Sequence, residues 1–168
     1  MKLLKVPYTK QIDESACGAA CLEMVYKYYG INNISQEDLM NLYKELEPHG
    51  SGYYRMTTDT LILDARKKGL KAVWLRANYT NKFDCLELLK ILIDKEVPII
   101  VCQQASQENA LLGHFRIVIG FDDQFVYLHD PNFQIAGNEL RWSIEDFVSL
   151  WQPTGANVTG GILCVITK

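Results

Sequence analysis

The sequence predicts one α+β domain over residues 1–168, in which N-terminal helices pack on a mainly antiparallel sheet. A length of 168 residues suits one domain and can bury a substantial core. The first half of the chain carries signals that start and end helices, and the second half carries mostly strand-like runs separated by turn residues. Helices followed by strands, rather than an alternation of the two, are typical of the α+β class.

Three helices are predicted in the N-terminal half, each from a side chain that can cap its start. Such a side chain accepts hydrogen bonds from N–H groups of the first turn, and a glycine after the last turn can end the helix. The expected helices run from a cap at Ser15 to about Tyr29 with Gly30 behind it, from the capping box of Ser35 and Asp38 to about Leu46, and from Thr57 or Thr58 to Gly69.

The second half contains the clearest hairpin of the chain. Its two strands, HFRIVIGF and FVYLHD, flank a turn at 122–124. The other elements expected here are a strand at 70–76, a helix at about 84–95, a strand at 99–104, a short helix capped by Ser143 with Asp146, and a last strand at 160–167.

Composition and charge exclude several classes of function. The formal net charge is -3 and the basic residues form no cluster in the sequence, so we expect no nucleic-acid partner. No apolar run is long enough for a signal peptide or a membrane span. The five cysteines are an odd number and widely spread, which favours free thiols over a disulfide framework. We therefore expect a cytoplasmic protein with no membrane segment of its own.

Cys17 differs from the other cysteines because it is expected in the first turn of a helix. Unpaired backbone N–H groups and the positive end of the helix dipole favour an anion there. A thiolate is such an anion, so this position lowers the pKa of a cysteine and makes it nucleophilic near neutral pH. The small residues that follow, beginning with Gly18, leave room for a substrate. A buried cysteine that only packs at a helix start explains the same residues and stays open at this point.

A nucleophilic thiolate needs a group that carries a proton to the leaving group, and His114 is favoured among the three histidines. His49 lies in a loop at 48–54 that is rich in polar and small residues. His129 lies on the hairpin with His114, but strand parity points it to the opposite face.

The register of the hairpin brings Asp130 to His114. With a three-residue turn Phe121 pairs with Phe125, and Asp130 then lies diagonally from His114 on the same face, roughly 7–8 Å away. Asp130 can then accept a hydrogen bond from the ring and fix its tautomer. A two-residue turn would reverse this parity.

Acyl transfer also needs donors for the oxyanion that forms during the reaction. The backbone N–H of Cys17 is one candidate, and the side-chain amide of Gln11, six residues upstream, is a second. A zinc site of Cys17, Cys21 and His114 is a weaker alternative, because no C-x-x-C pair, H-E-x-x-H run or second Cys/His cluster supports it. We expect no metal and no other cofactor.

The run QIDESACGAACLEMVYKYYG, followed by GHFRIVIGFDD and VYLHDPN, resembles the bacteriocin-processing cysteine peptidases of the papain-like superfamily. The resemblance extends from about Val6 to Cys164. It implies a papain-like cysteine peptidase fold in which Gln11 is the oxyanion donor, Cys17 the nucleophile, His114 the base and Asp130 its orienting partner.

The resemblance implies cleavage of a leader peptide after two glycines, by a domain that is usually attached to an ABC exporter. We therefore expect hydrolysis of a peptide or amide bond, a peptide-like substrate, and association with an exporter. The chain departs from the family pattern because it ends near residue 168 with no transporter attached, and because Ala16 stands where the exporter peptidases usually carry Asp. Two alternatives stay open: a peptidyl transferase similar to phytochelatin synthase, and a catalytically silent peptide-binding domain.

Overall fold

The computed structural model describes residues 2–44, 55–76, 82–152 and 160–168. The helices in these segments are α1 (Cys17–Tyr28), α2 (Gln36–Tyr43), α3 (Thr58–Lys67), α4 (Lys82–Asp94) and α5 (Ile144–Leu150). The strands are β1 (Lys2–Leu3), β2 (Lys71–Arg76), β3 (Ile99–Gln104), β4 (Gly113–Phe121), β5 (Phe125–His129), β6 (Leu140–Ser143) and β7 (Ile162–Thr167).

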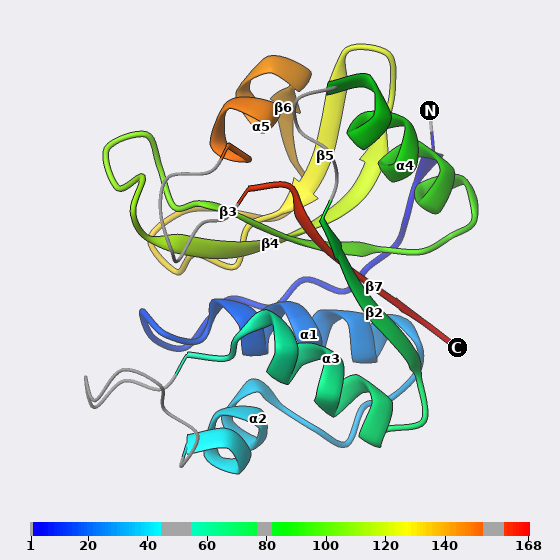
Figure 1. The fold of residues 1–168 in the computed structure, drawn as a ribbon. Helices are drawn as coiled ribbons and strands as arrows, with labels where there is room; N and C mark the ends of the chain where they lie inside the picture. Colours follow the sequence, from blue (N-terminus) through cyan, green and yellow to red (C-terminus); the bar gives the residue numbers. More distant parts are fainter. Residues whose placement is uncertain (1, 45–54, 77–81, 153–159) are drawn as a thin grey trace.

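The described strands form one antiparallel sheet in the order β2-β7-β3-β4-β5-β6, with β1 paired to the end of β4. Figure 1 shows α1, α2 and α3 on one side of this sheet and α4 and α5 on the other. Because helices cover both faces, every residue of β4 except the two at its ends is buried. The predicted α+β class is confirmed. No helix in the described segments has the length and apolar composition needed to cross a membrane.

Side-chain caps begin three of the helices, as the sequence predicts. Ser35 and Thr57 each accept a hydrogen bond from the backbone N–H three residues later and form capping boxes. Ser143 accepts the equivalent bond at the start of α5 at 3.0 Å. Gly30 and Gly69 follow α1 and α3 with φ of 81°, a conformation that glycine adopts without strain.

The predicted cap of α1 by Ser15 is wrong. Ala16 occupies the N-cap position, and no side chain caps the helix. The N–H of Ser15 donates to Oδ1 of Asp13 at 2.7 Å, so Ser15 belongs to the turn before the helix. Its Oγ is buried and has no hydrogen-bond partner in the described part of the chain. The helix begins at Cys17, so the cysteine is in the first turn as expected.

The β4–β5 hairpin has the predicted register near its open end but not at its turn. Phe121 pairs with Val126 rather than with Phe125. A bulge at Ile119 then shifts the register of β4 by one residue. The turn has one residue more than predicted on the β5 side, and the bulge adds one residue on the β4 side, so the two shifts of register cancel. Asp130 therefore lies on the face that the three-residue turn predicts. Beyond the bulge the pairs are Val118 with Leu128 and Ile117 with His129.

A buried carboxylate joins the three N-terminal helices. Asp64 of α3 is fully buried and accepts hydrogen bonds from Tyr26 of α1 at 2.5 Å and from Tyr43 of α2 at 2.7 Å. Burial and the adjacent carboxylate raise the pKa of Tyr26, so this hydroxyl remains a donor. The contact fixes α1, and therefore Cys17 at its start, relative to α2 and α3.

Candidate active site

Cys17 lies at the start of α1 with 7% of its surface exposed. Burial raises the pKa of the thiol, because a buried thiolate loses its hydration. A hydrogen bond and the charge of His114 lower it, as do backbone hydrogen bonds of Phe115 and Gly18. These contributions outweigh burial, so the pKa of Cys17 lies below its ordinary value of 9.0. An anionic sulfur, as expected at a helix start, is favoured at this position.

His114, at the start of β4, contacts both Cys17 and Asp130. Its Nε2 donates to Oδ1 of Asp130 at 2.7 Å, which leaves Nδ1 for the sulfur. Burial lowers the pKa of His114, but the hydrogen bonds to Asp130 and Cys17 raise it more, to above the ordinary value of 6.5. A raised imidazole pKa beside a lowered thiol pKa favours a thiolate–imidazolium pair.

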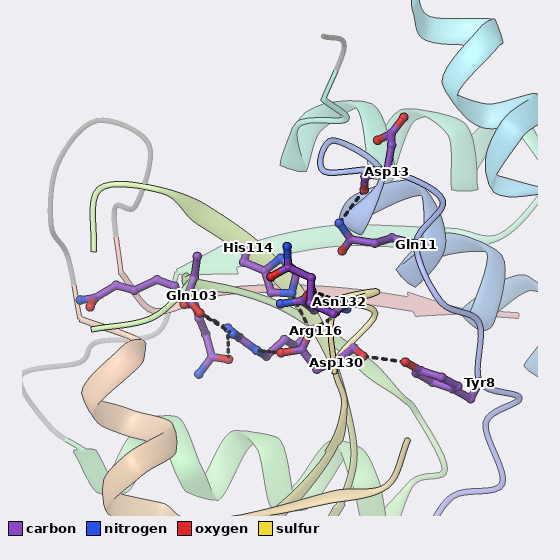
Figure 2. Close-up of polar contacts among 11 residues, drawn as sticks. Tyr8, Gln11, Asp13, Gln103, His114, Arg116, Asp130 and Asn132 are labelled. Atoms are coloured by element: carbon purple, nitrogen blue, oxygen red, sulfur yellow. Dashed lines mark hydrogen bonds and ion pairs between the residues drawn. The ribbon is translucent and has the colours of Figure 1, made fainter. Parts of the chain in front are cut away.

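Asp130 is 2% exposed, and both of its carboxylate oxygens are hydrogen-bonded. Oδ1 also accepts the N–H of Asn132 at 2.9 Å, and Oδ2 accepts Nε of Arg116 at 2.7 Å. Burial raises the pKa of a carboxyl, but His114 and Arg116 together hold the pKa of Asp130 well below its ordinary value of 3.8. The carboxylate is therefore ionised near neutral pH and fixes the orientation of the ring. Figure 2 shows His114, Asp130 and Arg116 joined in one row of polar contacts.

Arg116 is a buried cation that the sequence interpretation missed. It is 3% exposed, and its Cζ lies over the ring of Trp142, 4.9 Å from the ring centroid. In the predicted hairpin register Arg116 lies directly opposite Asp130, and a charged residue inside an apolar strand is the signal that could have identified it. Its other acceptors are the carbonyl oxygens of Gln104 at 3.0 Å and Ala105 at 2.8 Å, with Oε1 of Gln103 at 3.4 Å.

The start of α1 packs against β4 at Phe115, beyond the last residue of β4 that pairs with β5. Because β5 pairs with β4 only as far as Ile117, residues 113–116 of β4 pair with β3 alone. The backbone of Phe115 lies in this segment and helps to lower the pKa of Cys17. Gly18 permits this close approach, since a Cβ at this position would lie 3.2 Å from the Phe115 ring and 3.3 Å from Met56.

Gln11 lies in the segment that leads to α1 and is 6% exposed. Its backbone N–H donates to the carbonyl of Pro131 at 2.8 Å, which joins this segment to the residue after Asp130. Its Nε2 donates to the carbonyl of Asp13 at 2.6 Å, whereas Oε1 is buried with no hydrogen-bond partner among the described residues. The reverse orientation would place two oxygens in contact, so the amide nitrogen is fixed on the side of Asp13. This nitrogen carries a second N–H that can donate to a ligand.

Of the other two histidines, His129 lies in the described structure and does not join this site. His129 donates from Nε2 to the carbonyl of Val6 at 2.9 Å, and its Nδ1 accepts the N–H of Glu139 at 3.0 Å. Burial lowers the pKa of His129, so the ring is neutral and its two nitrogens are both occupied. His49 and the loop at 48–54 lie outside the described residues.

Known proteins provide an independent comparison. The sequence matches the Peptidase_C39 like family over residues 3–158. The peptidase domain of Streptococcus ComA, a bi-functional ABC transporter involved in a quorum sensing pathway, is 24% identical with a TM-score of 0.68, covering 99% of this chain and 97% of that one. A double glycine motif protease from an AMS/PCAT transporter, solved in complex with the leader peptide, is 24% identical with a TM-score of 0.64, covering 99% and 94%.

A C39-like peptidase from Bacillus anthracis is 18% identical with a TM-score of 0.72, covering 100% of this chain and 98% of that one. No curated protein matches the sequence. At these identities the likeness to solved structures shows the fold, and it agrees with the papain-like arrangement of helices and antiparallel sheet. The family match spans most of the chain, so the protein belongs to the Peptidase_C39 like family and is a cysteine peptidase of papain-like fold.

Proposed function

We propose that the protein cleaves a leader peptide after a Gly-Gly pair, with Cys17 as nucleophile, His114 as acid and base, Asp130 as orienting partner and Gln11 as oxyanion donor. The observation that carries this proposal is His114, whose ring contacts Asp130 at 2.7 Å and also lowers the pKa of Cys17. The lowered pKa of Cys17 and the raised pKa of His114 support a reactive ion pair. A domain that only binds peptides would need neither shift.

In the proposed acylation step the sulfur of Cys17 attacks the carbonyl carbon and forms a C–S bond. The electron pair of the carbonyl moves to oxygen, where the backbone N–H of Cys17 and the amide of Gln11 stabilise the negative charge. His114 gives its Nδ1 proton to the leaving nitrogen as the C–N bond breaks. The amine departs and the acyl-enzyme remains.

In the proposed second step water attacks the acyl carbon while Nδ1 of His114 takes its proton. The C–S bond then breaks and releases the carboxylic acid. The thiolate is thereby regenerated beside the imidazolium. Asp130 keeps the ring hydrogen on Nε2, so Nδ1 can take and give a proton in both steps.

The substrate class is supported by the relatives and by the crowding around the sulfur. One relative is a double glycine motif protease that binds a leader peptide. Cys17 is 7% exposed, so a substrate with no side chains next to the scissile bond fits best. We also propose that an ABC exporter carries the product and that processing occurs in the cytoplasm, where thiols stay reduced. The free cysteines Cys21, Cys102 and Cys164 agree with a reducing compartment.

Cleavage of a peptide library that includes leader-like segments ending in Gly-Gly tests the proposal. We expect mass spectrometry to detect new termini after Gly-Gly with the unmodified protein. Cys17→Ala should produce no cleavage and His114→Ala almost none, whereas Asp130→Asn should reduce the cleavage rate by a smaller factor. Cys164→Ala, which removes a buried thiol from β7, is the matched control and should remain active. Activity retained by the Cys17 variant would reject the mechanism. Addition of glutathione distinguishes hydrolysis, which yields a free carboxylate, from transfer, which yields a glutathione adduct.

A further inference from the structure

We infer that Gln36 is a positioning residue that holds Gln11 in place for oxyanion stabilisation, a role that rests on the function proposed for Gln11. Gln36 is the first residue of α2, a position where glutamine side chains usually extend into solvent. Here the residue is 5% exposed. Among the described residues its side chain makes two hydrogen bonds, and both go to the segment that carries Gln11.

The Gln36 amide binds the backbone on either side of Gln11. Its Nε2 donates to the carbonyl of Lys10 at 2.7 Å, and its Oε1 accepts the N–H of Ile12 at 2.9 Å. A neighbouring parallel strand would bind these same two groups, so the amide takes the place of one residue of such a strand. The N–H of Gln11 donates to Pro131 at 2.8 Å. Hydrogen bonds to Gln36 and to Pro131 thus fix the backbone at this residue.

Gln36 is itself fixed to the helix that begins with the nucleophile. Its backbone N–H donates to Oε2 of Glu23 at 2.7 Å, and Oε1 of Glu23 pairs with Lys27 at 2.6 Å. Glu23 is buried, so this pair is little screened by solvent. Glu23 and Lys27 both lie on α1. The contacts therefore run from the helix of Cys17, through Gln36, to the backbone of Gln11.

The side chain of Gln11 depends on this backbone for its position. Its only hydrogen bond within the described residues is the one from Nε2 to Asp13 at 2.6 Å, and its Oε1 has no partner there. A movement of the backbone at 10–12 would therefore carry the amide with it. Misplacement of a reacting or stabilising group by about 1 Å can cost roughly a hundredfold in rate. If the Gln36 contacts are lost while Gln11 stays bound to Asp13 and Pro131, the rate of acylation should fall about tenfold.

A cycle of four proteins tests this role: the unmodified chain, Gln11→Ala, Gln36→Met and the double variant. Methionine is close to glutamine in length and makes neither hydrogen bond. The measurement is the single-turnover rate of Cys17 acylation by p-nitrophenyl acetate, a small ester that reports the chemistry without requiring a leader sequence. We expect a loss of about a hundredfold for Gln11→Ala and about tenfold for Gln36→Met.

The double variant should be no slower than Gln11→Ala alone, because Gln36 acts through Gln11. The pH at half-maximal rate should not change in Gln36→Met, since Cys17 and His114 keep their contacts. Ser35→Ala is the matched control, because it removes the capping box of the same helix and leaves Gln36 in place. This control should lower the melting temperature and keep the acylation rate.

If Gln36→Met does not fold, Gln36→Asn takes its place in the cycle, because the asparagine amide is too short to reach both partners.

Two results would overturn the inference alone: a Gln36 variant that acylates at the unmodified rate, or a double variant slower than Gln11→Ala by the full tenfold. Full activity of Gln11→Ala would overturn the oxyanion role in the proposed function together with the inference. The two failures are therefore distinguishable.

Discussion

Replacement of Arg116 by methionine should destabilise the protein by about 3 kcal/mol, the lower end of the cost of breaking a buried ion pair. Arg116 and Asp130 are 3% and 2% exposed, and Nε lies 2.7 Å from Oδ2. The lower end is expected because Asp130 keeps His114 and Asn132 as donors. Arg116 also lines a cavity of about 430 Å³, through which water can reach the carboxylate once the guanidinium is removed.

The same substitution should move the alkaline limit of activity to higher pH. Three charged or titratable groups act on His114: Asp130 and Cys17 raise its pKa by hydrogen bonding, and the charge of Arg116 lowers it. Without Arg116 the pKa of His114 rises further above 6.5, so the imidazolium persists to higher pH. Activity requires the protonated ring, so the descending limb of the pH–rate profile shifts upward.

Urea denaturation and the pH–rate profile of Gly-Gly peptide cleavage, in which the leaving nitrogen must be protonated, measure the two effects. Arg116→Lys is the matched control, because it keeps the charge but cannot reach Asp130 and the two backbone carbonyls together. We expect the lysine variant to be destabilised with its alkaline limb close to that of the unmodified protein. An alkaline limb that stays in place or falls in Arg116→Met, or an unchanged free energy of unfolding, would refute the reasoning.

Two further substitutions separate stability from activity. Asp64→Asn, which weakens the acceptor shared by Tyr26 and Tyr43, should lower the free energy of unfolding by about 1–3 kcal/mol; urea denaturation measures this, and an unchanged midpoint would contradict the contact. Gly18→Ala places a Cβ 3.2 Å from the ring of Phe115, so either this ring or the start of α1 must shift by a few tenths of an ångström. Its acylation rate should fall several-fold with little change in melting temperature, and an unchanged rate would show that the sulfur tolerates this movement.

The elements that the sequence predicted well have local signals. The capping boxes at Ser35 and Thr57 involve residues only three apart, and the glycines that follow α1 and α3 act on the adjacent backbone. Ser15 carries the same type of signal, but the turn formed by Asp13 places it one residue before the N-cap. Strands β1 and β6 were not predicted, because they are short and owe their conformation to pairing with β4 and β5.

The site was predictable where its residues lie on one hairpin and unpredictable where its contacts join distant parts of the chain. The contact between His114 and Asp130 follows from hairpin parity, although the turn and the bulge that produce it were not foreseen. Arg116 could have been identified from the same parity. Gln36 could not, because its partners lie 24 and 26 residues away and a glutamine at a helix start has the composition of a surface residue.

The thiolate at Cys17 is tested most directly by the pH dependence of iodoacetamide alkylation, measured at each cysteine by mass spectrometry. Cys17 should react with a midpoint below pH 9.0, and the midpoint should rise in His114→Ala because burial then dominates its pKa. Cys164, whose pKa burial raises to about 12, should stay unreactive over the same range. A Cys17 midpoint that does not move in His114→Ala, or alkylation of Cys17 no faster than that of Cys164, would contradict the account.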